Sequence, residues 1–222
     1  MRKRNRVLPR SAARGGRPTK ARAAEIDEHI LATASDFFAR TGFAATSVEQ
    51  VALACGAGKD TIYRRFPSKR SLFTADIERA RVRILARLEG IADQEHGADS
   101  LSRLRNVMRW LLDVNLDPEL LAFKRIWFGE AMLQAMQSWK MPDPDPIMQR
   151  LVLLVSGAQA SGHLRNADPV FLTTQLISSI ITGPTTTAML GQTPFASDTA
   201  KEIYFDQAWM LFIGGVARDV SR

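Results

Sequence analysis

The sequence predicts an all-α protein in which a three-helix N-terminal module precedes a larger helical domain. Apolar residues recur at helical spacing along most of the 222-residue chain, and no run of β-branched residues alternates strictly. Capping residues and prolines divide these runs into about nine helices. Hydrophobic residues make up 45% and charged residues 24% of the chain, which is usual for a globular protein with a substantial core. We expect three parts, at residues 1–22, 23–70 and 71–222.

Residues 1–22 form a basic leader with nine arginine or lysine residues and no acid, on a chain whose net charge is +7. Prolines and glycines interrupt this leader, so we expect a disordered basic arm rather than the amphipathic helix of an Arg-rich transit peptide. Val7-Leu8 is too short for the apolar core of a secretory signal. The charge indicates a polyanionic partner, either nucleic acid or an anionic membrane surface.

The helices of residues 23–70 are predicted from apolar spacing and end signals. Apolar residues from 26 to 38 form one stripe of a first helix, and Gly42 ends it because glycine tolerates left-handed conformation. The second helix begins at Thr46, whose hydroxyl forms a capping box with the carboxylate of Glu49. A third helix spans about 58–65, ahead of a proline at 67, and a fourth spans about 69–92.

The rest of the chain is also predicted to be helical, over about 99–115, from 118, and over 147–163, 169–190 and 198–217. Asp117 and Asp168 each precede a proline, as N-cap residues do. Gly183-Pro184 is expected to kink its helix. The last two helices are apolar nearly all round, so we expect them to bury each other across the two-fold axis of a homodimer through Leu176, Ile177, Ile180, Ile181, Trp209, Leu211, Phe212 and Ile213.

Two short helices at 47–55 and 58–65, joined by a glycine-containing turn, are typical of a helix-turn-helix. The second helix of such a motif enters the major groove of DNA. Here it offers hydroxyls and cations, the side chains that contact phosphates and base edges, at Lys59, Thr61, Tyr63, Arg64 and Arg65. A helical hairpin with a solvated charged face fits the same pattern, so spacing alone leaves both interpretations open.

Longer motifs carry a resemblance to a known family. The segments Gly16-Arg17-Pro18, 38–43, 46–52 and 56–69, with the last containing Tyr63-x-x-Phe66-Pro67-Ser68-Lys69, resemble the opening of a tetracycline-repressor (TetR) family regulator. The match covers about residues 16–75. The resemblance implies a ligand-responsive transcriptional regulator, typically a repressor, that binds a double-stranded, pseudo-palindromic DNA operator as a homodimer. It also implies a cytoplasmic, nucleoid-associated protein.

The resemblance further assigns DNA contacts by position. It implies phosphate contacts from Thr46, Tyr63 and Lys69 and groove contacts from Lys59, Thr61 and Arg64, while Arg17 reaches a flanking minor groove from the basic arm. Two residues depart from the family pattern. Gly58 stands where the family usually has Ser or Thr, so a helix cap is missing. Arg65 stands where an aromatic residue or His is common, and either adds a phosphate contact or alters the helix orientation.

In this family the second part of the chain is an all-α ligand-sensing and dimerisation domain. Aromatic and methionine side chains suit an adaptable apolar cavity, although ordinary core packing accounts for each of them singly. We expect a small hydrophobic effector, neutral or weakly charged, within residues 100–180. The candidate lining and anchoring residues are Trp110, Phe123, Trp127, Met132, Gln134, His163, Phe171 and Gln175. The segment from Asp117 through Phe128 and the Gly183-Pro184 helix resemble the AefR-like branch.

No catalytic residue, metal site or cofactor is predicted, and we expect no enzyme. One cysteine and three scattered histidines supply neither a nucleophile–base set nor helical metal-ligand spacing. Cys55 is either a small buried side chain or a redox-sensing thiol. No apolar run is long enough to span a membrane, so no membrane partner is expected. The alternative to a DNA-binding regulator is a helical adaptor whose basic leader binds an anionic membrane surface or a partner, without preference among DNA sequences.

Overall fold

The computed structural model describes residues 20–94, 99–133 and 145–216, with the side chains of 94 and 130–133 left out. The helices are α1 (Lys20–Ala45), α2 (Val48–Ala54), α3 (Lys59–Arg65), α4 (Lys69–Gln94), α5 (Ser100–Asn115), α6 (Pro118–Leu133), α7 (Pro146–Ala160), α8 (Pro169–Ile177), the π-helical turn η1 (Ser178–Thr182), α9 (Gly183–Met189) and α10 (Asp198–Val216). Because α8, η1 and α9 are continuous, the described ranges form nine helices and no strand. The predicted fold class is confirmed.

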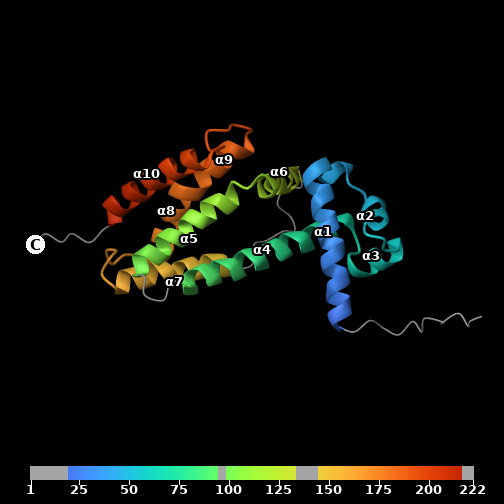
Figure 1. Cartoon of the computed structure of the whole chain (residues 1–222), viewed down its shortest axis with the longest axis horizontal. Helices are drawn as coiled ribbons and strands as arrows, with labels where there is room; N and C mark the ends of the chain where they lie inside the picture. The colour runs from blue at the N-terminus through green and yellow to red at the C-terminus, as the bar shows by residue number, and fades with distance from the viewer. Residues whose placement is uncertain (1–19, 95–98, 134–144, 217–222) are drawn as a thin grey trace, which may run out of the picture.

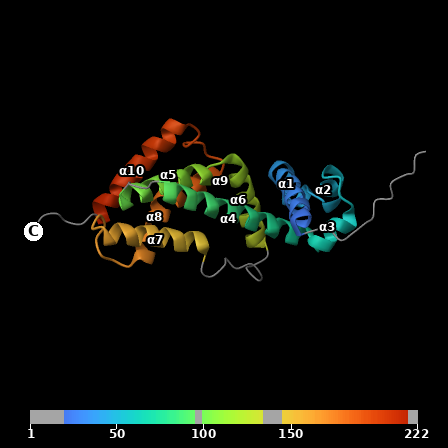
Figure 2. The same ribbon diagram turned by 60° about the horizontal axis from the view of Figure 1, so that its bottom comes forward.

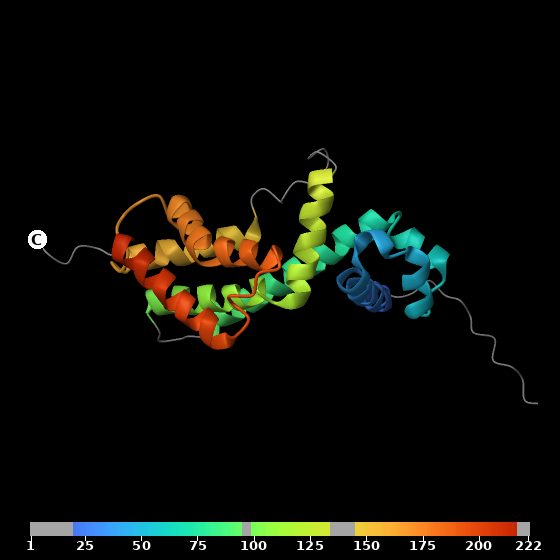
Figure 3. The ribbon, with the colours of Figure 1, turned by 90° about the horizontal axis from the view of Figure 1, so that it is seen from above.

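The helices group into a small module and a larger body. Helices α1 to α3 lie at one end of the elongated molecule, and α4 runs from them into the body made by α5 and α7 to α10 (Figures 1 and 2). Helix α6 stands across the junction (yellow-green in Figure 3), where it packs against both α1 and α9. Two helices, α4 and α6, therefore connect the module to the body.

The core of the small module follows from the predicted apolar stripe of α1. Ile30, Ala34 and Phe38 recur every four residues and are buried, so they face the same side of the helix. Val51 of α2 and Ile62 of α3 close over this stripe and are also fully buried. Removing each such large apolar side chain from water stabilises the fold by about 1.5–3 kcal/mol. The amphipathic pattern thus fixes how the three helices pack.

This core extends past residue 70, the expected end of the module. Leu72 and Phe73 of α4 and Phe123 of α6 are buried in the same cluster. At the other end, α1 begins at Lys20, so the last three residues of the predicted arm are helical. Residues 1–19, the remainder of that arm, lie outside the described residues.

The capping box at the start of α2 is shifted by one residue from the prediction. Ser47, not Thr46, is the N-cap: its Oγ accepts a hydrogen bond from the Gln50 N–H at 3.1 Å, and Gln50 Oε1 accepts one from the Ser47 N–H at 2.8 Å. Glu49 is thereby left free for another contact. Gly42 interrupts the end of α1 with φ at 82°, a conformation that favours glycine, as expected.

The C-terminal helices contribute side chains to the core of their own chain. Ile180, Phe205 and Phe212 are buried among α5, α7 and α8, so the expectation that Phe212 faces a partner is wrong. At the expected kink, a π-helical turn directly precedes Gly183-Pro184. Such a turn accommodates the missing N–H and the bulk of the proline ring. Over the three described ranges, no helix combines the length and hydropathy that crossing a membrane requires.

Candidate nucleic-acid interface and ligand cavity

The turn between α2 and α3 is built from glycines and backbone hydrogen bonds. Gly56 has φ at 64°, and the Ala57 N–H donates to the Ala52 carbonyl at 3.0 Å. Gly58 is the N-cap of α3 and contributes no side-chain hydrogen bond. This agrees with the prediction that glycine at this position, in place of Ser or Thr, leaves the helix without a side-chain cap. Ile62 points into the core, so the opposite side of α3 must face outward. The arrangement is a helix-turn-helix with an outward-facing second helix.

Four side chains of α3 are exposed: Lys59, Asp60, Tyr63 and Arg64. The Thr61 side chain beside them is half-buried. The Lys59 ammonium pairs with Glu49 of α2 and lies 5.6 Å from the Tyr63 ring centroid. The hydrogen bond between Lys59 and Glu49 lowers the pKa of Glu49 and raises the pKa of Lys59, so both groups are charged at neutral pH. The outer face therefore offers two cations, a phenol and a hydroxyl together with the carboxylate of Asp60.

Thr46 and Lys69 are placed differently from their expected phosphate contacts. The Thr46 side chain is 2% exposed, and its hydroxyl donates to the Gly42 carbonyl at 2.7 Å. The Lys69 ammonium donates to the carbonyls of Phe43, Ala44 and Thr46 at 2.7, 3.2 and 2.9 Å. Three bonds use all three N–H donors of a lysine, so Lys69 satisfies the carbonyls at the end of α1 instead.

Ion pairs fix α3 to α1 and α1 to α4. Arg65 Nε lies 2.8 Å from Asp27 Oδ1 of α1, so this ion pair joins the end of α3 to α1. Arg79 of α4 pairs with Glu28 of α1 at 2.7 Å and with the buried Asp76 at 2.9 Å. These ion pairs link α4 to α3 by way of α1. Arg17, the remaining predicted DNA contact, lies outside the described residues.

The larger body contains a cavity of about 280 Å³ between α4, α5, α6, α7 and the α8–η1 segment. Its lining is mostly aliphatic and aromatic, and includes two of the predicted ligand-binding residues, Phe123 and Trp127. The volume is near the lower end of the range typical of small-molecule sites. An apolar lining of this kind suits a small hydrophobic ligand.

Three polar side chains also line this cavity, and the sequence analysis selected none of them: Arg81, Asn115 and Lys124. Lys124 lies on α6 between the aromatic residues Phe123 and Trp127, where it is partly buried, and its ammonium donates to Asn115 Oδ1. Burial lowers the pKa of Lys124 to about 8. A Lys-Arg pair within an otherwise apolar helix segment was the available signal in the sequence.

The other predicted ligand-binding residues are dispersed. Trp110 lines a neighbouring pocket of about 480 Å³, which shares Phe123 but also contains Asp76 and Arg79. Phe171 and Gln175 line an open groove on the outer face of α8 and α10. Gln134 and the side chain of Met132 lie outside the described residues. Of the predicted residues whose side chains are described, Phe123 and Trp127 alone line the apolar cavity.

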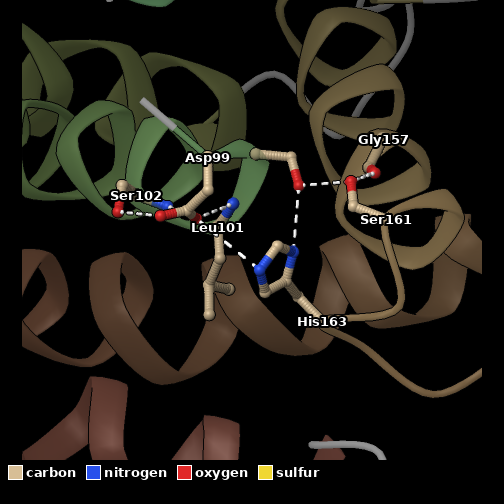
Figure 4. Close-up of polar contacts among 7 residues, drawn as sticks. Asp99, Leu101, Ser102, Gly157, Ser161 and His163 are labelled. Carbon is tan, nitrogen blue, oxygen red and sulfur yellow. Dashed lines mark hydrogen bonds and ion pairs between the residues drawn. The ribbon is translucent and has the colours of Figure 1, made fainter. Parts of the chain in front are cut away.

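His163 is not in the cavity. Figure 4 shows its ring between the start of α5, at Asp99, and the end of α7, at Ser161. Its Nδ1 is 3.3 Å from Ser100 Oγ, and its Nε2 is 4.0 Å from Asp99 Oδ1. The role expected for it as a ligand anchor is replaced by a contact between two helix ends.

Among the described residues, the histidines, the acidic residues and Cys55 do not assemble a metal site. Within the described ranges, no three His, Cys, Asp or Glu residues are grouped so as to hold a metal ion. The Cys55 thiol lies 3.7 Å from the Ala52 carbonyl at the end of α2. Lys59, four residues further along the chain, pairs with Glu49.

Comparison with known proteins agrees with the helix-turn-helix geometry. A family model described as bacterial regulatory proteins, tetR family, matches residues 30–75, from within α1 to the first turns of α4. We call residues 30–75, which match this family model, the tetR-family region. The HTH-type transcriptional regulator AcrR of Shigella flexneri is 32% identical over 103 residues, 46% of this chain. That match spans 47% of AcrR, so this chain covers about half the length of that relative.

Solved structures extend the likeness of fold beyond the tetR-family region. A TetR-family transcriptional regulator from Mesorhizobium loti superposes with a TM-score of 0.75 over 89% of this chain and 99% of that one, at 22% identity. SmeT, the repressor of the Stenotrophomonas maltophilia multidrug efflux pump SmeDEF, superposes with a TM-score of 0.63 over 87% of this chain and 91% of that one, at 24% identity. SmeT has also been solved in complex with triclosan. At these identities the likeness concerns the fold of module and body together.

Proposed function

We propose that this chain is a ligand-responsive transcriptional regulator, specifically a repressor, that binds a pseudo-palindromic DNA operator as a homodimer. The observation that carries the proposal is the outer face of α3. Lys59, Tyr63 and Arg64 are exposed on the second helix of a tetR-family helix-turn-helix, while Ile62 holds that helix to the core. Exposed cations and hydroxyls on such a helix are the groups that contact phosphates and base edges in the major groove.

An apolar surface on α8 and α10 supports the homodimer. Phe171 and Leu211 are 55% and 81% exposed, and both line the groove between the two helices. Large exposed apolar side chains grouped on one face are typical of interaction surfaces. Pairing of this face with a second copy across a two-fold axis would place two α3 helices for the two halves of a pseudo-palindrome.

The cavity supports release of DNA by a small hydrophobic effector. It opens onto α4, the helix that is fixed to the DNA-binding module by the Arg79–Glu28 ion pair. An effector shifts the equilibrium only if it binds the released state more tightly than the DNA-bound state. The triclosan complex of SmeT, a repressor of the same fold, is consistent with this proposal. We also propose that this regulator belongs to the AefR-like branch of the family. Its proposed location is the cytoplasm, in association with the nucleoid.

The proposal is tested by selection of DNA from a random pool, followed by binding measurements at several salt concentrations. We expect enrichment of an inverted repeat, and an affinity that falls steeply with salt as phosphate counterions are released. Vesicles of anionic lipid are the parallel arm. Binding to these vesicles with no enrichment of any DNA sequence would favour the helical adaptor and contradict the regulator.

A further inference from the structure

We propose that the apolar cavity binds a small apolar carboxylic acid as its carboxylate, with the carboxylate oxygen accepting a hydrogen bond from Lys124. The inference rests on the proposed effector function of this cavity and names the chemical class of the effector. It is carried by the placement of a cation with unused hydrogen-bond donors inside an aromatic and aliphatic lining.

Lys124 has no acidic partner among the described residues. Its ammonium donates to Asn115 Oδ1, and no ion pair to it is found in those ranges, whereas Arg79 and Arg81 of α4 and Arg105 and Arg109 of α5 pair with carboxylates. A lysine ammonium has three N–H donors, so two remain for a ligand. A cation removed from water without a counter-charge costs free energy, and an anionic ligand oxygen would offset that cost.

Asn115 orients the lysine toward the cavity. Its side-chain N–H donates to the Leu111 carbonyl at 2.7 Å within α5, which leaves Oδ1 facing Lys124. Both side chains line the cavity. The donors of Lys124 are therefore held at the cavity wall by a residue whose own geometry is fixed by a backbone hydrogen bond.

Arg81 is the other cation of the lining, and it is already neutralised. Its guanidinium lies 2.6 Å from Asp145 at the start of α7 and 3.6 Å from Glu78. These two carboxylates balance Arg81, so the lining carries one uncompensated charge, that of Lys124. A ligand with one acidic group matches this charge, while a ligand cation would face Lys124 without a carboxylate in the lining.

The pKa of Lys124, which burial lowers to about 8, gives the proposal a second readout. Near pH 8.5 much of the free protein holds Lys124 as the neutral amine. A bound carboxylate favours the ammonium and raises the pKa of Lys124, so binding takes up roughly half a proton.

The test uses three probes of one shape: 2-naphthoic acid, its neutral amide and 2-naphthylmethylamine. Calorimetry on the full chain measures affinity, and repetition in buffers of different ionisation enthalpy measures proton uptake. We expect the acid to bind at least about tenfold more tightly than the amide, because one charge-assisted hydrogen bond contributes a difference in affinity of this size. Lys124→Met should abolish both the preference and the proton uptake. Lys20→Met, which removes an exposed lysine at the start of α1, should change neither.

The outcomes separate this inference from the proposed function. Equal affinity for acid and amide, or a preference that survives Lys124→Met, overturns the assignment of Lys124. In that case release of operator DNA by the amide would still support a hydrophobic effector. Failure of all three probes to bind overturns the acid-binding assignment, while selective operator binding would leave the DNA-binding function standing. Trp127→Ala should weaken acid and amide alike if both occupy this cavity.

Discussion

Phe123 of α6 stacks on Phe73 of α4, with ring centroids 4.7 Å apart and an interplanar angle of 28°. Phe123 also lines the apolar cavity, and the Phe73 ring meets the Phe38 ring of α1 edge-on at 5.1 Å. A continuous series of aromatic contacts therefore runs from the cavity to the core of the DNA-binding module. A ligand that displaces Phe123 would act directly on the packing of α4 against α1.

Phe123→Leu and Phe73→Leu should weaken this coupling. Each removes a stacked partner but keeps an apolar side chain, so the pair should show an interaction of about 0.5–1.5 kcal/mol in a double-mutant cycle of chemical denaturation. Effector-induced release of operator DNA should become weaker in both variants. Phe195→Leu, at a ring pair remote from the cavity, is the matched control. Full release by the bound effector in Phe123→Leu would show that coupling runs elsewhere, for example through the Arg79 ion pairs.

Lys69→Met should lower stability rather than remove a phosphate contact. The ammonium donates to three carbonyls at the end of α1, and its loss leaves those acceptors without their charged partner. We expect the free energy of unfolding to fall by about 1–3 kcal/mol. DNA affinity, measured where the variant is fully folded, should be nearly unchanged, and its salt dependence should match that of the wild type. A shallower salt dependence in Lys69→Met would restore the phosphate assignment.

Arg64 and Arg65 are neighbours in sequence with different expected roles. Arg64 is exposed on the outer face of α3, whereas Arg65 pairs with Asp27 of α1. Arg64→Ala should relax sequence preference at particular bases, by about 1–3 kcal/mol for a good bidentate contact. Arg65→Ala should instead lower stability, on the order of 1 kcal/mol for a partly exposed ion pair. Equal loss of specific and random DNA binding in Arg64→Ala would place that side chain on phosphate.

The helices were predictable from the sequence because apolar spacing and end signals are local. The capping of α2 shows where local patterns stop being sufficient. Thr46 and Glu49 fit the capping-box spacing, and so do Ser47 and Gln50 one residue later. The choice between them depends on Thr46 being buried against the end of α1, a contact that the spacing does not encode.

The candidate site was predictable only where its residues share one helix. The exposed face of α3 follows from a single helical period around Ile62. The cavity instead gathers side chains from five segments, so Phe123 and Trp127 were found through their shared helix, whereas Asn115 and Arg81 carried no local signal. Likewise, the partners of Lys69 lie 23 to 26 residues away in the sequence, which no motif spacing reports.

The groove on α8 and α10 gives the sharpest test of the homodimer, because adjacent residues there have opposite environments. Leu211 is 81% exposed, whereas Phe212 is 8% exposed within the core of its own chain. Leu211→Glu should leave a folded chain whose sedimentation coefficient is that of a monomer, since a charge in an apolar interface is costly to bury. Phe212→Arg should unfold or aggregate, because it buries a charge among α5 and α8. Circular dichroism separates these two outcomes from each other.

Ile203→Glu, which changes another exposed apolar residue of α10 outside that groove, is the control for a general effect of charge. A Leu211→Glu variant that remains dimeric at micromolar concentration would rule out this face as the interface, and a monomeric wild type would rule out the dimer itself.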